Sequence, residues 1–457
     1  MIFEWPIVQL ADCVELFTGF PFKSADYTDS PDGVRLLRGD NIGQGLLRWD
    51  GVKRWPSENR ERIPEYELME KDVVLAMDRP WIPAGLKFAK VRKSDLPALL
   101  VQRVARLRPK KLIRADYLNY IVASREFTEY IQNVTTGTAV PHISSKQISA
   151  FKFRLPDLKN QQAVGELLTA LDDRITLLRE TNATLEAIAQ ALFKSWLVDF
   201  DPVHAKQQGR VPEGMDEATA ALFPDSFEES ELGLVPRGWR VQPVGDVVES
   251  VGGGTPDTKE ASYWEPAEHC WTTPKDLSGA TAPVLLTTER KLSAKGLAKV
   301  SSGLLPAGAL LLSSRAPIGY LSVAQVPLAI NQGYIAMLPS SQLPPLYMLF
   351  WCRQNMETIK GRANGSTFME ISKKAFRPIP ALVPPAPVID AFVGVAGTLF
   401  DRLVENEKQA QTLATLRDTL LPRLISGQLR LPEAGAGLPA LQAASNGVLQ
   451  QRMHAIQ

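Results

Sequence analysis

Two stretches of the chain carry the same spacing of hydrophobic residues, and each predicts one long helix. In the first stretch, apolar side chains recur every three or four residues, at Val164, Leu168, Leu171, Ile175, Leu178, Leu185, Leu192 and Trp196. In the second stretch, the series is Phe392, Ala396, Leu399, Leu403, Asn406, Ala410, Leu413, Leu420 and Leu424. Asn182 and Ala189 fill the two remaining positions of the first series. This spacing is typical of the seam of a helix that packs on another helix, so we expect two long helices packed together.

The two stretches belong to a longer internal repeat. Residues 137–196 align without a gap on residues 365–424, an offset of 228, and 12 of the 60 aligned positions are identical. Earlier segments repeat in the same order: residues 36–42 correspond to 271–277, 73–79 to 309–315, and 101–109 to 331–339. Short apolar runs between turn residues predict a strand-rich unit before each helix.

The predicted fold class is α+β. We expect two similar globular domains separated by two long helices, which pack as an antiparallel coiled coil with a pseudo-two-fold internal repeat. The predicted boundaries are 1–157 for the first domain, 158–202 for the first helix, 203–236 for a linker or acidic excursion, 237–386 for the second domain, 387–427 for the second helix, and 428–457 for a flexible tail.

Composition narrows the class of protein. Apolar content of 45% and charged content of 22% are ordinary for a soluble globular chain. The N-terminal residues show no basic segment followed by an apolar core, and no apolar run is long enough to span a membrane. The three cysteines form no CxxC motif, which argues against a disulfide framework or a zinc site. We therefore expect a cytoplasmic protein without a membrane segment.

The net charge of +1 conceals an uneven distribution. Residues 70–114 contain 12 Lys or Arg and only four acidic residues, whereas residues 201–235 contain eight acidic residues against Lys206 and Arg210. A basic block is what phosphate binding requires, although a solvated surface would have the same composition. Charge alone leaves both interpretations open.

Several catalytic motifs are missing from the sequence. It contains no GxxxxGK[ST], no GxSxG, no HExxH, and no Asn/Asp-Pro-Pro-aromatic sequence of the kind expected of an amino-methyltransferase. The glycine-rich segment 252–256 ends in Pro256 and lacks the Lys-Ser/Thr of a phosphate-binding loop. We interpret it as a tight turn between a strand and a loop.

The second half of the chain resembles a known family. The motifs GGGTPDT, WTTPKDLS, LLSSRAPIGYL, INQGYIAML and GSTFMEIS occur in the order found in the second target-recognition domain of type I restriction-modification specificity subunits. LFKSWLVDFDPV and LLPRLISGQL resemble that family's central and C-terminal shared segments. The resemblance extends to about residue 430 and is weakest over residues 1–130.

The resemblance implies a DNA-binding subunit without catalysis of its own. Each recognition domain would read one half of a split double-stranded DNA sequence. The helices would set the spacer and hold two methyltransferase (modification) subunits and, through them, the restriction/translocase subunits. S-adenosylmethionine, ATP and magnesium would be bound by those partner subunits, and this chain would bind no cofactor.

Candidate site residues lie in the repeated loops. Arginines and lysines that leave a strand into a loop are suited to bases or phosphates, and small hydroxyl residues can contact phosphates. The predicted DNA-binding residues are Arg38, Arg79, Thr138, Lys146, Lys275, Arg315, Ser366, Thr367 and Lys374. Arg79 is taken as the counterpart of Arg315, and Lys275 and Arg38 are the next two candidates. Asn331-Gln332 and His142 fit structural roles better. Trp196 and Phe200, where the first helix ends, are predicted to bind a partner, with a core role as the alternative.

Two other classes of protein remain as alternatives. The first is a DNA-modifying enzyme with its own active site fused to a coiled coil, which would require a cofactor motif that the sequence lacks. The second is a coiled-coil adaptor, for which two large, unlike globular domains and a basic block would be unnecessary.

Overall fold

The structure, a computed structural model, describes residues 5–82, 85–137, 140–365 and 369–431. The chain divides into two compact units: unit 1 comprises residues 1–174 and 412–457, and unit 2 comprises residues 175–411. Each unit contains one globular domain together with a part of both long helices, α5 (Leu158–Leu197) and α13 (Ala386–Ile425). None of the helices in these described residues is long and apolar enough to cross a membrane.

The globular domain of unit 1 is built on two small sheets. The first is antiparallel, in the order β2 (Val14–Thr18), β10 (Val104–Pro109), β5 (Val73–Ala76) and β8 (Phe88–Lys90). The second has the order β4 (Arg54–Trp55), β3 (Val34–Leu37) and β9 (Ala98–Leu100), with β3 and β9 parallel. Two short ladders join β1 (Ile7–Gln9) to β11 (Lys152–Arg154) and β6 (Trp81–Ile82) to β7 (Gly85–Leu86).

The globular domain of unit 2 repeats this plan. Its larger sheet has the order β15 (Ser250–Val251), β22 (Tyr334–Met337), β19 (Leu310–Ser313), β20 (Leu321–Ala324) and β17 (Val284–Leu285). Its smaller sheet has the order β18 (Arg290–Leu292), β16 (His269–Thr272) and β21 (Leu328–Ile330), with β16 and β21 parallel. A short ladder joins β14 (Arg240–Pro243) to β23 (Pro380–Val383). The strand order of one domain therefore maps onto the other, and the predicted internal repeat is confirmed.

Short helices complete both domains. Unit 1 contains α1 (Leu10–Cys13), α2 (Ala115–Ala123), α3 (Arg125–Val134) and α4 (Ser145–Ser149). Unit 2 contains α6 (Asp201–Gln207), α7 (Glu217–Ala221), α8 (Val244–Val247), α9 (Ala294–Leu297), α10 (Pro345–Gln354), α11 (Met356–Gly361) and α12 (Lys373–Phe376). The pairs α2–α3 and α10–α11 occupy corresponding places in the repeat, as do α4 and α12.

The backbone conformation explains where α5 ends, and the proline positions explain where α13 begins. α5 ends at Leu197, before the end of the predicted segment 158–202, because Phe200 adopts a left-handed conformation (φ 55°). α13 starts directly after Pro384-Pro385 and carries Pro387 in its first turn, where proline costs no helical hydrogen bond.

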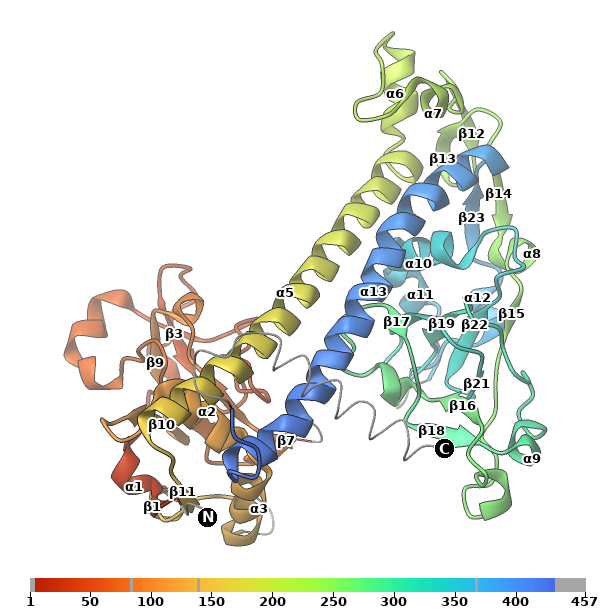
Figure 1. The fold of residues 1–457 in the computed structure, drawn as a ribbon. Coiled ribbons are helices and arrows are strands. Elements are labelled where there is room, and N and C mark those ends of the chain that lie inside the picture. Colours follow the sequence, from red (N-terminus) through yellow and green to blue (C-terminus); the bar gives the residue numbers. More distant parts are fainter. Residues whose placement is uncertain (1–4, 83–84, 138–139, 366–368, 432–457) are drawn as a thin grey trace. The chain divides into compact units, whose positions relative to one another are not determined.

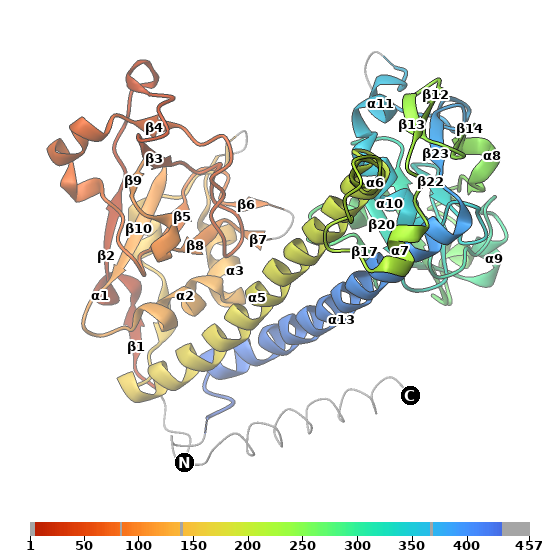
Figure 2. The same cartoon turned by 90° about the horizontal axis from the view of Figure 1, so that it is seen from above.

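Within each unit, α5 and α13 pack against each other along the predicted seam. In unit 2, Asn182 bonds to Asn406 and to the carbonyl of Leu403. In unit 1, Asp172 forms an ion pair with Arg417 at 2.6 Å. Partner numbers on α13 fall as those on α5 rise, so the pair is antiparallel, as both ribbon views show (Figures 1 and 2). The predicted fold class is confirmed.

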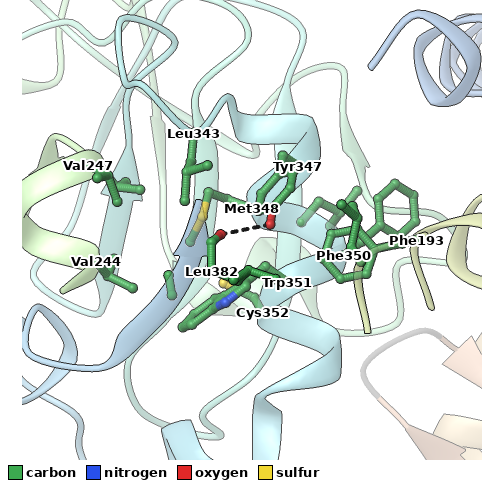
Figure 3. Packing of buried hydrophobic residues seen from close by; sticks show 14 of the residues in the cluster. Phe193, Val244, Val247, Leu343, Tyr347, Met348, Phe350, Trp351, Cys352 and Leu382 are labelled. Atoms are coloured by element: carbon green, nitrogen blue, oxygen red, sulfur yellow. Dashed lines mark hydrogen bonds between the residues drawn. The ribbon is translucent and has the colours of Figure 1, made fainter. Parts of the chain in front are cut away.

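The core of unit 2 joins its domain to the helices. Phe193 of α5 lies against Tyr347 and Phe350 of α10, with ring centroids 5.2 and 6.1 Å apart (Figure 3). The hydroxyl of buried Tyr347 donates to the carbonyl of Leu382 at 3.0 Å, so its polar end is satisfied. These contacts attach α10, and with it the globular domain of unit 2, to α5.

Residues 203–236, predicted as a linker or acidic excursion, fold onto the same core. They contain α6 from Val203 onward, α7, and a hairpin of β12 (Phe227–Ser230) and β13 (Gly233–Pro236). Val203, Phe223 and Val235 are buried in the unit 2 core. The acidic side chains are on the outside of this hairpin, where Glu228 accepts a bond from the Gly238 amide at 2.9 Å.

Candidate nucleic-acid interface

Four loops meet at one edge of each globular domain, which we call the loop edge. In unit 1 they are residues 38–41 after β3, 77–80 after β5, 101–103 before β10, and the described residues 135–137 and 140–143 between α3 and α4. Backbone bonds tie them together: Met77 N donates to Arg103 O at 2.9 Å, and Ile143 N donates to Met77 O at 2.9 Å. The loop edge is therefore held by the main chain, which leaves its side chains available for binding.

Unit 2 has the same loop edge, made by residues 273–276, 314–317 and 331–333 and by the described residues 364–365 and 369–371. Ser314 N donates to Gly333 O at 2.8 Å, and Ile371 N donates to Ser314 O at 3.0 Å. These bonds are the counterparts of those made by Met77 in unit 1. The repeat thus extends from the strands into the candidate site.

This bonding corrects the predicted pairing of Arg79 with Arg315. Since Met77 corresponds to Ser314, the counterpart of Arg315 is Asp78, and the counterpart of Arg79 is Ala316. Both Arg79 (φ 45°) and Ala316 (φ 54°) are left-handed and precede a proline, which supports this register. The repeat segments 73–79 and 309–315 are therefore shifted by one residue from their sequence alignment.

Arg38 and Lys275 lie at non-equivalent positions of the repeat, in agreement with the alignment of residues 36–42 with 271–277. Arg38 N donates to Asn41 Oδ1 at 3.1 Å, and Thr273 N donates to Asp276 Oδ2 at 2.7 Å in the same kind of turn. Arg38 therefore corresponds to Thr273, and Lys275 corresponds to Asp40. At equivalent places the two domains present opposite charges.

The two domains also differ in the contact between the loop after the strand, β5 or β19, and the segment before α4 or α12. Asp78 bridges His142, with Oδ1 and Nδ1 2.5 Å apart, whereas Arg315 bridges Glu370, with Nη1 and Oε2 3.6 Å apart. His142 and Glu370 occupy the same position of the repeat, since each forms the backbone bridge to its own loop. Equivalent loops are thus held by an aspartate–histidine contact in unit 1 and by an arginine–glutamate ion pair in unit 2.

In unit 1 three cations gather at the loop edge. Arg79 is exposed and, among the described residues, its side chain has no bonding partner, while Arg38 pairs only loosely with Asp40 at 3.5 Å. Lys87, which the sequence analysis did not select, lies beside them: its Nζ is 4.0 Å from the position that a Cβ would take on Gly39. Burial lowers the pKa of Lys87; Asp40 raises it and Arg79 lowers it further. A phosphate placed here would stabilise the charged lysine.

In unit 2 the exposed polar groups are different. The Lys275 side chain is 75% exposed and pairs with Glu289 at 3.2 Å, and Arg315 is about one-third exposed. Gln332 accepts a bond from the Thr255 hydroxyl at 2.6 Å, whereas Asn331 accepts one from Gly333 N at 2.8 Å. The Asn331 side chain therefore stabilises the conformation of its own loop. The side chain of exposed Gln332 is held in place by its bond to Thr255.

The remaining predicted DNA-binding residues follow the loop edges. Lys146 and Lys374 are exposed on α4 and α12, and neither side chain has a bonding partner among the described residues. Each helix is capped by the serine before it, Ser144 or Ser372. The predicted sites Thr138, Ser366 and Thr367 lie outside the described residues.

Comparison with known proteins gives the family. The sequence model of the type I restriction modification DNA specificity domain matches residues 3–187 and 236–393, once for each half of the repeat. The chain belongs to this family. The HindI specificity subunit of Haemophilus influenzae is 28% identical over 88% of this chain and 96% of that protein. The MjaIX specificity subunit of Methanocaldococcus jannaschii is 34% identical over 40% of this chain and 42% of its own length.

A solved structure shares the fold. The S subunit of a type I restriction-modification system from M. genitalium matches 92% of this chain and 96% of its own, with a TM-score of 0.51 and 14% identity. Specificity-family chains thus combine two globular domains with two long helices at low sequence identity.

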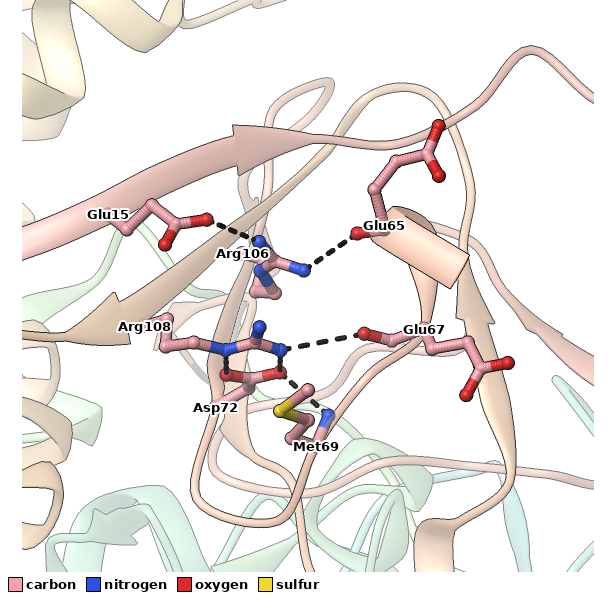
Figure 4. A network of polar contacts seen from close by, with 7 residues as sticks. All are labelled: Glu15, Glu65, Glu67, Met69, Asp72, Arg106 and Arg108. Carbon is pink, nitrogen blue, oxygen red and sulfur yellow. Dashed lines mark hydrogen bonds and ion pairs between the residues drawn. The ribbon is translucent and has the colours of Figure 1, made fainter. Parts of the chain in front are cut away.

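Part of the basic block of this specificity-family chain is structural. Buried Arg106 donates to the Glu15 carboxylate at 2.8 Å and to the Glu65 carbonyl at 2.9 Å, and Arg108 makes two 2.8 Å bonds to buried Asp72 (Figure 4). The hydrogen bonds that Arg108 donates to the Asp72 carboxylate raise the pKa of Arg108. These arginines are committed to the interior of unit 1, so a count of basic residues overstates the charge available to DNA.

The Asp72–Arg108 pair supplies a stability prediction. Substituting Asp72→Ala leaves Arg108 without its bidentate partner and the Met69 amide without its acceptor, and should cost about 3 kcal/mol. Chemical denaturation followed by fluorescence measures the midpoint. The matched control is Arg125→Ala, which breaks the exposed Arg125–Glu129 pair and should leave the midpoint almost unchanged. Equal shifts in the two variants would contradict a structural role for Asp72.

The predicted partner-binding residues have different surroundings. Trp196 is buried in the unit 2 core, in edge contact with Phe223 at 5.4 Å and Phe392 at 6.4 Å. Its predicted partner contact is therefore replaced by a core role, because segment 203–236 covers the ring. Phe200 is half-buried between Phe227 and Trp239.

The glycine-rich segment 252–254 has a packing function. A Cβ on Gly253 would lie 1.8 Å from the carbonyl oxygen of Ile330, so no larger residue fits at this position. Gly19 in unit 1 is equally tight, 2.2 Å from the Val101 carbonyl. Both glycines allow the backbone to pass close to the parallel strand pair of its own domain; residues 252–256 form no turn, so this close approach replaces the predicted tight turn.

Proposed function

We propose that the chain is the DNA sequence-recognition subunit of a type I restriction-modification complex, and that each globular domain reads one half of a bipartite target. One observation carries the proposal: the two domains share a backbone plan at the loop edge but place opposite charges at equivalent positions. Equal frameworks with unequal side chains are suited to an asymmetric, interrupted DNA sequence.

In this proposal the chain performs no catalysis. It holds two methyltransferase subunits and, through them, the restriction/translocase subunits, and it acts in the cytoplasm. S-adenosylmethionine, ATP and magnesium are bound by those partners. The missing cofactor and nucleotide motifs support this division of labour, as do the names of the related specificity subunits.

Methylation assays test the division of labour. The purified chain alone should transfer no methyl group from radiolabelled S-adenosylmethionine to genomic DNA, while the chain combined with its methyltransferase subunit should modify adenines at one bipartite sequence. Mapping methylated sites across the genome of a strain carrying the complete system identifies that sequence. Methyl transfer by the chain alone would favour the alternative of a fused enzyme.

The cations of the unit 1 loop edge give a prediction for binding. If Arg79 and Lys87 each neutralise a phosphate, the double substitution R79Q/K87Q removes two counterion-release contributions. The slope of log affinity against log salt should then become shallower by about 1.8, at roughly 0.9 for each lost contact. Fluorescence anisotropy with target DNA at several salt concentrations measures the slope.

A matched control lies at the far end of β10. Lys111 is exposed and follows that strand, whereas the loop edge precedes it. Lys111→Gln should therefore leave the slope unchanged. An unchanged slope in R79Q/K87Q, or an equal change in K111Q, would remove Arg79 and Lys87 from the interface.

A further inference from the structure

The helix seam of unit 2 contains one fully buried polar layer. Asn182 and Asn406 are 1% and 2% exposed. Asn406 Nδ2 donates to Asn182 Oδ1 at 3.0 Å, and Asn182 Nδ2 donates to the carbonyl of Leu403 at 3.3 Å. The next contact along the seam is apolar, since Leu185 packs with Leu403 and Val404. Each amide in this layer therefore depends on the other helix for its bonds.

The internal repeat shows that this polar layer is not duplicated. The offset of 228 carries Asn182 onto Ala410 and Asn406 onto Leu178. Leu178 and Ala410 are buried as well, at 3% and 2% exposure, and form the layer equivalent to the asparagine pair. One of two equivalent layers is thus Asn–Asn and the other is Leu–Ala.

This arrangement distinguishes between ways of pairing the helices. Because α5 and α13 share one seam, α5 could pair with α5 of a second copy in the same register. Position 182 of each copy would then face position 178 of the other, so each Asn182 would face a leucine. A buried amide without a partner is strongly unfavourable, and this would occur twice. In an α13–α13 pair, Asn406 would likewise face Ala410.

We propose that the Asn182–Asn406 pair selects pairing of the two unlike helices within one chain, against pairing of like helices between two copies. A single polar residue in a coiled-coil seam fixes register and partner in this way at some expense of stability. This proposal concerns which helices associate, within one chain or between two copies, and so it goes beyond DNA recognition. Its consequence, that one chain always presents two unlike domains to a target, rests on the proposed function.

Variants of the full-length chain test the selection. The double variant N182L/N406L removes the polar layer. It should therefore lose the preference for pairing α5 with α13 of the same chain. L178N/N406L keeps two asparagines but places both on α5, so that only an α5–α5 pair between copies satisfies them. Each protein is refolded from denaturant over a concentration series, and its mass is measured by sedimentation equilibrium. Circular dichroism verifies the helix content.

We expect the wild-type chain to keep the mass of one copy. The dimer fraction should rise at least tenfold in N182L/N406L and further in L178N/N406L. A rescue variant moves the pair to the equivalent layer, L178N/A410N in the N182L/N406L background, and should return to the mass of one copy. This rescue keeps the test decisive where L178N/N406L fails to fold.

Two results would overturn the proposal. One is a dimer fraction in N182L/N406L equal to that of the wild-type chain. The other is a rescue variant that dimerises as much as N182L/N406L. No DNA is present in these measurements, so their outcome is independent of whether the chain recognises a bipartite sequence.

Discussion

Replacing residues 1–155 by the corresponding segment of a relative with a different target should change one half of the recognised DNA sequence and leave the other half intact. The exchanged segment carries the whole loop edge of unit 1, whereas the side chains of the unit 2 loop edge, including Arg315 and Glu370, are untouched. Specific binding typically exceeds non-specific binding by roughly 10³- to 10⁷-fold, so the original half-site should lose most of that preference. Methylation mapping with the reconstituted complex reads both halves at once.

The exchanged segment should preserve the contacts that the unit 1 domain makes with the long helices. Tyr120 of α2 donates to Asp172 of α5 at 2.7 Å, and Asp172 in turn pairs with Arg417 of α13. Gly165 of α5 also lies close to Asp116, because a Cβ there would be 3.1 Å from the Cβ of Asp116. A donor segment that keeps Tyr120 and a compact residue at position 116 should dock on the existing helices.

The reciprocal exchange serves as the control. Replacing residues 237–386 should change the other half-site and preserve the first. If either exchange altered both halves together, the two loop edges would not act as separate readers, and the interpretation of the repeat as two independent recognition domains would be wrong.

The long helices and the repeat could be predicted from the sequence because their signals are local and extended. The three-four spacing from Val164 to Trp196 records the buried stripe of α5 directly, and a second copy of the pattern in α13 makes chance agreement improbable. Helix ends were less predictable. The left-handed turn at Phe200 depends on the packing of segment 203–236, which no periodicity reveals.

The candidate site was only partly predictable, since its geometry depends on strand register. An alignment that matches Arg79 with Arg315 looks natural in sequence, and only the backbone bonds of Met77 and Ser314 reveal the one-residue shift. Lys87 was missed because it directly precedes β8 and belongs to none of the four loops, and its approach to Gly39 depends on tertiary packing. Arg106 and Arg108 belong to the same basic block, but the acids that bury them, Glu15 and Asp72, are distant from them in the chain.

Inserting one heptad into both long helices at matched positions should lengthen the undefined middle of the DNA target. Suitable positions are between Arg179 and Glu180 in α5 and between Lys408 and Gln409 in α13. Both lie between the Asn182–Asn406 layer and the equivalent Leu178–Ala410 layer. A full heptad returns the seam to the same face, so the helices should still pair. Each helix grows by about 10 Å at 1.5 Å per residue, the length of about three base pairs.

Binding sites selected from a library of variable spacers measure the effect. Both half-sites should be retained, with about three additional base pairs between them. Over that length DNA also rotates by about 100°, given roughly 10.5 base pairs per turn, so affinity should fall unless the domains turn with it. A heptad inserted into α5 alone is the control: it staggers the Asn182–Asn406 layer and should abolish bipartite binding. A double insertion that still prefers the original spacer with undiminished affinity would mean that the helices do not set the distance between half-sites.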